Sequence, residues 1–219
     1  MLLIDKDMSV INPNHLIEEY LDPTADLIFY DLLSSHDIVI NSYLVKNTEY
    51  ARNFLLKWSL HESSTNSETF HSVANHNVAF YEIYLDEFCF YCTYPERKRC
   101  KELWTSKKTC NEINLYKTCS RELLGKREKF ESGDGCLVLR SNASNGYWAR
   151  DARITNSSWA STDFILQEFK SDVWEGPFLS ENFTKTLCAD PKTAYSCWHY
   201  NQSYIKTDNE IKWYFGRCF

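Results

Sequence analysis

The chain has 219 residues, of which 43% are hydrophobic and 16% aromatic. This composition supplies a core for one substantial domain with a small satellite, and it excludes a disordered chain. The formal net charge of −6 at pH 7 argues against general nucleic-acid binding, which depends on clustered cations. No run of about 18 apolar residues occurs, so the sequence predicts no membrane span.

The first predicted elements alternate between strand and helix. Residues 2–4 form a short apolar run that is typical of a buried parallel strand, and residues 16–21 carry apolar side chains at helical spacing. Residues 25–30 and 38–45 are predicted to be further strands. A strand, helix and strand within about 30 residues favour a parallel sheet.

Helices are predicted for the middle of the chain. Residues 47–49 provide a polar N-cap and an acid in the first turn, and the apolar residues that follow lie on one helical face. A second helix is predicted near residues 77–87, and two more between residues 99 and 124, the last ending at Gly125. Residues 136–140 are predicted to form a strand, after which the pattern becomes irregular.

Cysteine is frequent, and all nine cysteines lie in the later part of the chain. Four Asn-x-Ser/Thr sites lie there too, and together these features favour an oxidising, secretory setting. The odd count leaves at least one thiol unpaired within the chain. The cysteines are Cys89, Cys92, Cys100, Cys110, Cys119, Cys136, Cys188, Cys197 and Cys218, and the four sites are Asn142, Asn156, Asn182 and Asn201.

Zinc binding is an alternative interpretation of the first cysteines. Cys89 and Cys92 have the two-residue spacing of a zinc knuckle, and Cys100 or Cys110 could complete the ligand set. No second closely spaced pair follows, which favours disulfides.

Two carboxylates, Asp5 and Asp7, follow the first predicted strand. Ligands of open α/β sheets bind at the carboxyl edge of the strands, where these side chains are expected to emerge. Carboxylate oxygens suit hard divalent ions such as Mg²⁺ or Mn²⁺, which keep open positions for phosphate oxygens. An Asp-x-Asp triplet alone is a weak signal, because such triplets are common on protein surfaces.

Several longer segments resemble a known family. They read Val-Ile-Asn-Pro at residues 10–13, Ile-Phe-Tyr-Asp at 28–31, Asn-Ser-Tyr-Leu-Val-Lys-Asn-Thr-Glu-Tyr-Ala at 41–51, Trp-Ala-Arg-Asp at 148–151 and Thr-Asn-Ser-Ser-Trp at 155–159. Together they resemble a poorly characterised, galactosyltransferase-related family of glycosyltransferase-like proteins with the GT-A fold. The resemblance covers roughly residues 2–170.

This resemblance implies an α/β fold. The expected architecture is a partial GT-A-like (Rossmann-like), mainly parallel sheet with flanking helices over residues 1–175, followed by an irregular Cys-rich extension over residues 176–219. In GT-A folds, strands before the Asp-x-Asp bind the nucleotide base and ribose. The chain is therefore expected to be N-terminally truncated, with residues 2–4 forming an exposed sheet edge.

The resemblance also implies a reaction and a place for it. A hexose such as galactose would pass from a sugar nucleotide to a glycan acceptor in the Golgi lumen, with Mn²⁺ (or Mg²⁺) as cofactor. The residues at matching motif positions are Asp5 and Asp7 for the metal, and His71, Asn75, Trp148, Arg150 and Asp151 for the substrate.

The motifs also depart from the family pattern. Ala74 stands where the family has an acid, Gln167 where it has a histidine of the metal and diphosphate site, and Glu168 where it has a glycine close to phosphate. These departures predict impaired activity. The alternative is a non-catalytic relative that acts as a binding protein in the secretory pathway. A third hypothesis, an unrelated secreted disulfide-rich binding module, requires the match at residues 41–51 to be a coincidence.

Overall fold

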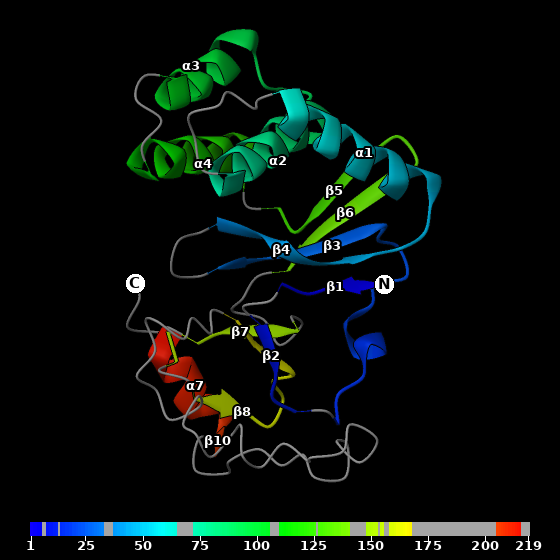
Figure 1. The fold of residues 1–219 in the computed structure, drawn as a ribbon, viewed down its shortest axis with the longest axis vertical. Coiled ribbons are helices and arrows are strands. Elements are labelled where there is room, and N and C mark those ends of the chain that lie inside the picture. The colour runs from blue at the N-terminus through cyan, green and yellow to red at the C-terminus, as the bar shows by residue number, and fades with distance from the viewer. Residues whose placement is uncertain are drawn as a thin grey trace. The chain divides into compact units, whose positions relative to one another are not determined.

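The computed structural model of the protein contains two compact units, one formed by residues 1–3 and 21–141 and the other by residues 4–20 and 142–219 (Figure 1). The structure describes residues 1–5, 8–12, 14–32, 37–64, 72–105, 110–125, 127–140, 148–152, 154–155, 158–167 and 205–215.

The first unit is built on a five-stranded sheet with strand order β1-β4-β3-β6-β5. Its central strands β3 and β6 run parallel, whereas β4 lies antiparallel to both β1 and β3, and β5 antiparallel to β6. The strands are β1 (Leu2–Leu3), β3 (Leu27–Leu32), β4 (Asp37–Val45), β5 (Lys129–Ser132) and β6 (Gly135–Arg140).

The sheet is therefore mixed, and the prediction of a mainly parallel sheet is wrong. Only four residues separate β3 from β4, and strands joined by so short a connection pair antiparallel, because a parallel pair needs a long crossover. β1 and β3 do run in the same direction, but β4 lies between them.

β1 also differs from the predicted buried parallel strand. It is a two-residue strand at the sheet edge, paired antiparallel with β4. Leu3 is exposed, as is Ile4 just after it. The expectation of an exposed edge at residues 2–4 is thus confirmed.

Four helices follow β4 in the same unit, and Figure 1 shows them stacked on one side of the sheet. They are α1 (Glu49–Ser64), α2 (Ser72–Phe88), α3 (Tyr94–Thr105) and α4 (Cys110–Leu124). All four were predicted, although α2 and α3 each begin five residues earlier than the sequence pattern indicates.

The helix ends follow the expected local chemistry. The Thr48 hydroxyl caps α1 by accepting the Ala51 N–H at 3.2 Å, while it donates to Asp26 at 2.7 Å. At the end of α4, Gly125 has φ +73°, the left-handed conformation that glycine adopts without strain, and its N–H donates to the Arg121 carbonyl.

An aromatic cluster forms the core between these helices and the sheet. Phe80 of α2 is fully buried, and its ring centroid lies 5.0 Å from those of both Phe29 (β3) and Trp58 (α1). The predicted apolar face of α2 is buried as well. It comprises Val78, Tyr81, Leu85 and Phe88.

Two disulfides lie among the helices. Cys100 and Cys119 join α3 to α4, and Cys89 pairs with Cys92 in the turn between α2 and α3. The zinc interpretation is therefore wrong for these cysteines, since both members of the Cys-x-x-Cys pair are oxidised to each other. Cys136 of β6 is a buried free thiol, in agreement with the odd cysteine count.

The second unit contains a three-stranded sheet of order β2-β9-β7 and a two-stranded sheet of β10 and β8. Among the described residues its elements are β2 (Met8–Val10), the 3-10 helix η1 (Ile17–Tyr20), β7 (Ala149–Asp151), β8 (Trp159–Ala160), β9 (Ile165–Gln167), β10 (Ile205–Lys206) and α7 (Asp208–Phe215). A small core of Ile11, Ala152, Trp159 and Leu166, with Ile205 packed against it, joins β8, β9 and β10 to the segments that follow β2 and β7.

Several predictions fall outside the described residues. They concern the boundary at residue 175, the late cysteines Cys188, Cys197 and Cys218, and all four Asn-x-Ser/Thr sites. Among the helices that the structure describes, none is both long and apolar enough to span a membrane.

Candidate functional site

Strand pairing in the second unit places residues from three predicted motifs side by side across the three-stranded sheet. Gln167 at the end of β9 lies opposite Met8 of β2, and Asp151 at the end of β7 lies in register with Gln167 on its other side. Met8 follows Asp7 directly in the sequence. We call Met8, Gln167 and Asp151 the end row; it joins segments that lie more than a hundred residues apart.

Two residues of the end row share a feature with the ligand-binding edge of open α/β sheets, which lies at the carboxyl ends of the strands. β7 and β9 are parallel, so Asp151 and Gln167 occupy the carboxyl ends of two neighbouring strands. Asp5 is held close to the same row, because the Met8 N–H donates to the Asp5 carbonyl at 3.2 Å. The side chains of Gln167 and Asp151 are only 4% and 1% exposed.

Arg150 points away from Asp151, since side chains alternate along a strand. Its guanidinium donates to Asp163 Oδ1 through Nε at 3.0 Å and Nη2 at 2.5 Å. The other oxygen of Asp163 accepts the Ala160 N–H at 2.7 Å. Both charged groups are buried, so Arg150 anchors the turn between β8 and β9.

The remaining predicted site residues are placed as follows. Trp148 is fully buried, and its carbonyl accepts the Ile165 N–H at 2.9 Å, so its ring belongs to the interior rather than to an open sugar-stacking surface. Asn75 lies in α2 of the first unit. Asp7, His71 and the side chain of Asn75 lie outside the described residues.

A polar contact around His15 was not predicted, because a single histidine carries little signal in a sequence. Its Nδ1 lies 2.7 Å from Glu19 Oε2 and its Nε2 lies 2.9 Å from the Ser161 carbonyl, so both ring nitrogens face acceptors. Burial opposes the charged form, but the bonds to Ser161 and Glu19 and the nearby charge of Asp163 outweigh it and raise the pKa of His15. The i, i+4 spacing of His15 and Glu19 is the one local signal for this contact.

We expect this contact to make stability depend on pH. Because the pKa of His15 is raised above 6.5 in the folded state, the stabilisation is fully present below pH 6.5 and is lost as the pH rises through the folded-state pKa. His15→Gln removes the titrating group while keeping a polar side chain. Urea unfolding of both proteins between pH 6 and pH 9 should give a stability difference that shrinks as the pH rises. A constant difference would contradict the prediction.

The ability of this region to hold a metal ion depends on the oxygen-bearing side chains near the end row. Among the residues that the structure describes, no group of three or more His, Cys, Asp and Glu is placed to hold a metal ion. Asp7 is outside that set, so the predicted metal site stays a prediction.

Comparisons with known proteins give one match. The sequence pattern of a family described as "Protein of unknown function, DUF273" matches residues 1–179. No curated protein and no protein of solved structure shows significant similarity to the chain.

Proposed function

The chain belongs to the DUF273 family, whose function is unknown. We propose a function from its motif resemblance to glycosyltransferases and from the strand register of its second unit. In this proposal the chain is a glycosyltransferase-like domain, and it binds a sugar nucleotide through a divalent cation held by Asp5 and Asp7. The reaction class is hexosyl transfer, for example of galactose, to a glycan acceptor.

The register of the end row is the observation that carries this proposal. Met8, next to the Asp-x-Asp triplet, pairs with Gln167, and Gln167 is in register with Asp151. Gln167 and Asp151 bring an amide and a carboxylate to the row, and Asp5 and Asp7 lie close to Met8 in the sequence; such oxygen donors fit Mn²⁺ or Mg²⁺. The donor set is therefore compatible with the proposed ion.

The residues of the site have distinct tasks in this proposal. A bound divalent ion supplies charge neutralisation to a diphosphate leaving group. Asp5 and Asp7 hold the ion, and Gln167 offers a carbonyl oxygen from the neighbouring strand. Asp151, in register with Gln167, places a buried carboxylate beside it.

The first test is nucleotide binding. We expect the chain to bind UDP in the presence of Mn²⁺, and we expect the double replacement Asp5→Asn and Asp7→Asn to weaken that binding by more than about tenfold, because amides are poorer ligands for a hard cation. Isothermal titration calorimetry with and without Mn²⁺ measures both effects.

Asp208→Asn is the matched control in the same unit. Asp208 is an exposed carboxylate that accepts a hydrogen bond from Thr162 at 2.9 Å, far from the end row in sequence. Its replacement removes the same charge and should leave UDP binding unchanged. Absence of Mn²⁺-dependent UDP binding by the unaltered chain would sink the proposal.

A second candidate function is binding without transfer. Gln167 favours it, because this residue occupies the centre of the end row and an amide is a weaker ligand than imidazole for Mn²⁺. If this candidate is right, the chain binds Mn²⁺ and UDP weakly or not at all, and it releases no UDP from UDP-galactose. Gln167→His should then tighten Mn²⁺-dependent binding; turnover by the unaltered chain would exclude the candidate.

We place this function in the secretory pathway. The two disulfides support it, since disulfides persist in oxidising compartments. Partners in this proposal are a sugar nucleotide and a glycan acceptor, and the net charge of −6 gives no support for a nucleic-acid partner.

A further inference from the structure

The two disulfides described in the first unit differ in what they connect. Cys100 and Cys119 are 19 residues apart and tie two helices together, whereas Cys89 and Cys92 are 3 residues apart and close a single turn. A short closed loop restricts the unfolded chain less than a long one. The Cys89–Cys92 bond therefore contributes less to the stability of the fold and is free to serve another purpose.

Burial distinguishes its two sulfur-bearing residues. Cys89 follows the last residue of α2 and is fully buried, whereas Cys92 is partly exposed and precedes α3. The neighbours of Cys92 are open to solvent. Phe90, Tyr91 and Tyr94 are 71%, 60% and 78% exposed. Cys92 is therefore the more accessible of the two cysteines.

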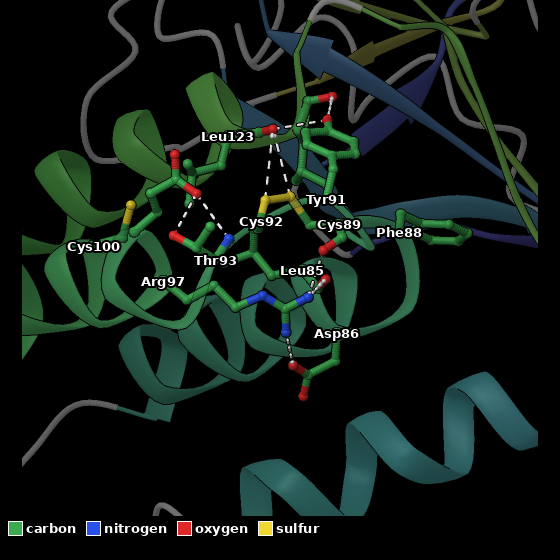
Figure 2. The surroundings of a disulfide bond; sticks show 12 residues. Leu85, Asp86, Phe88, Cys89, Tyr91, Cys92, Thr93, Arg97, Cys100 and Leu123 are labelled. Atoms are coloured by element: carbon green, nitrogen blue, oxygen red, sulfur yellow. Dashed lines mark hydrogen bonds and ion pairs between the residues drawn. A yellow bond between two sulfur atoms is a disulfide. The ribbon is translucent and has the colours of Figure 1, made fainter.

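The end of α4 provides an acceptor for the reduced form. Figure 2 shows both sulfurs facing the Leu123 carbonyl, at 3.5 Å for Cys89 and 3.9 Å for Cys92. In the disulfide neither sulfur carries a hydrogen, and the Tyr91 hydroxyl donates to this carbonyl at 2.9 Å. After reduction, each new S–H group already has an acceptor within reach.

Other bonds hold the turn in place when the disulfide is open. Arg97 of α3 donates to the Cys89 carbonyl at 2.7 Å and the Leu85 carbonyl at 3.1 Å, and it also contacts Asp86 at 2.7 Å (Figure 2). The Cys92 N–H donates to the Cys89 carbonyl at 3.1 Å. The backbone of the turn is thus fixed independently of the S–S bond.

We propose that Cys89 and Cys92 form a thiol–disulfide exchange site that accepts electrons from an external dithiol, with Cys92 as the sulfur attacked. A thiolate of the dithiol attacks Cys92 Sγ, forming a mixed disulfide and releasing Cys89 as a thiolate, which takes a proton from solvent. The second thiolate of the dithiol attacks its own sulfur in the mixed disulfide and releases Cys92. The dithiol is oxidised to a disulfide, and Cys89 and Cys92 become two thiols.

The unaltered protein tests this directly. It is incubated with graded dithiothreitol, quenched with acid, alkylated and digested with trypsin, which cuts at Arg97, Lys98 and Arg99 and so separates the two pairs. We expect Cys89 and Cys92 to be alkylated at dithiothreitol concentrations at least about tenfold lower than Cys100 and Cys119. Reduction of both pairs together, or of Cys100–Cys119 first, would overturn the proposal.

Two variants test which sulfur is attacked. Cys89→Ser leaves the Cys92 thiol, and Cys92→Ser leaves the Cys89 thiol. With oxidised glutathione, we expect the first variant to form a mixed disulfide at least about tenfold faster than the second. Equal rates, or the reverse order, would refute attack at Cys92.

Cys136 is the internal control for the reaction of the two variants with oxidised glutathione. It is a buried thiol, and burial raises its pKa, so it should stay unmodified while the protein is folded. Modification of Cys136 in a variant means that the variant has unfolded. In that case the alkylation pattern of the unaltered protein alone tests the proposal.

Discussion

Replacing Arg150 with methionine is expected to lower the free energy of unfolding by about 3–5 kcal/mol, the range found when one partner of a buried ion pair is removed. The carboxylate of Asp163 is buried and accepts two bonds from Arg150. In the variant it keeps the Ala160 N–H but loses its countercharge. Urea unfolding followed by tryptophan fluorescence measures the loss, because Trp148 and Trp159 lie in the same unit.

Lys98→Met is the matched control for this prediction. Lys98 pairs with Glu102 at 3.8 Å on the surface of α3, where both side chains are more than half exposed. Removing that pair should change stability by less than about 1 kcal/mol. A second comparison adds Asp163→Asn to Arg150→Met. The double variant has no buried unpaired carboxylate, so its free energy of unfolding should be higher than that of Arg150→Met alone. If Arg150→Met lowers the free energy of unfolding by less than about 1 kcal/mol, Arg150 is not the buried ion-pair partner that stabilises Asp163.

This outcome bears on the proposed function. The family resemblance suggests Arg150 as a substrate residue, whereas its contacts tie it to Asp163 within the fold. Asp151, the next residue, belongs to the end row on the opposite side of the strand. A variant of Arg150 that loses both folding and UDP binding therefore says nothing about substrate contact, and Asp5 and Asp7 are the better positions for testing the site.

Much of the fold was predictable because local rules govern it. The apolar stripe of α2 and the stop at Gly125 follow from side-chain spacing and from the freedom of glycine at φ +73°. The sheet was not predictable in the same way. The apolar run at residues 2–4 is compatible with a buried parallel strand and with an antiparallel edge, and only its pairing with β4 decides between them.

The candidate site was likewise predictable only where it depends on local sequence. The Asp-x-Asp triplet and the Gln167 substitution are visible in the sequence, and motif comparison linked them. The direct register of Met8 with Gln167 is a contact between distant segments, which residue spacing does not encode. The His15 contact was missed because one of its partners is a backbone carbonyl, that of Ser161, and carbonyls are the same in every residue.

The aromatic core of the first unit leads to the second large prediction. Phe80 is fully buried at the centre of five other rings, with centroid distances from 5.0 Å to 6.2 Å. These rings come from β3, α1 and α2 itself, so Phe80 joins the sheet to two helices. They are Phe29, Phe54, Trp58, Tyr81 and Tyr84.

Phe80→Ala is expected to lower the free energy of unfolding by about 3–5 kcal/mol, because the lost apolar contacts leave a cavity that aromatic neighbours cannot fill without leaving their own contacts. Leu60→Ala is the control: Leu60 lies on α1 with most of its side chain exposed, so the same truncation to alanine should cost less than about 1 kcal/mol. Urea unfolding followed by far-UV circular dichroism gives both values. Similar losses in the two variants would mean that Phe80 does not hold the helices on the sheet. A large loss in Phe80→Ala alone would show that the contact between α1, α2 and β3 is a main source of the stability of this unit.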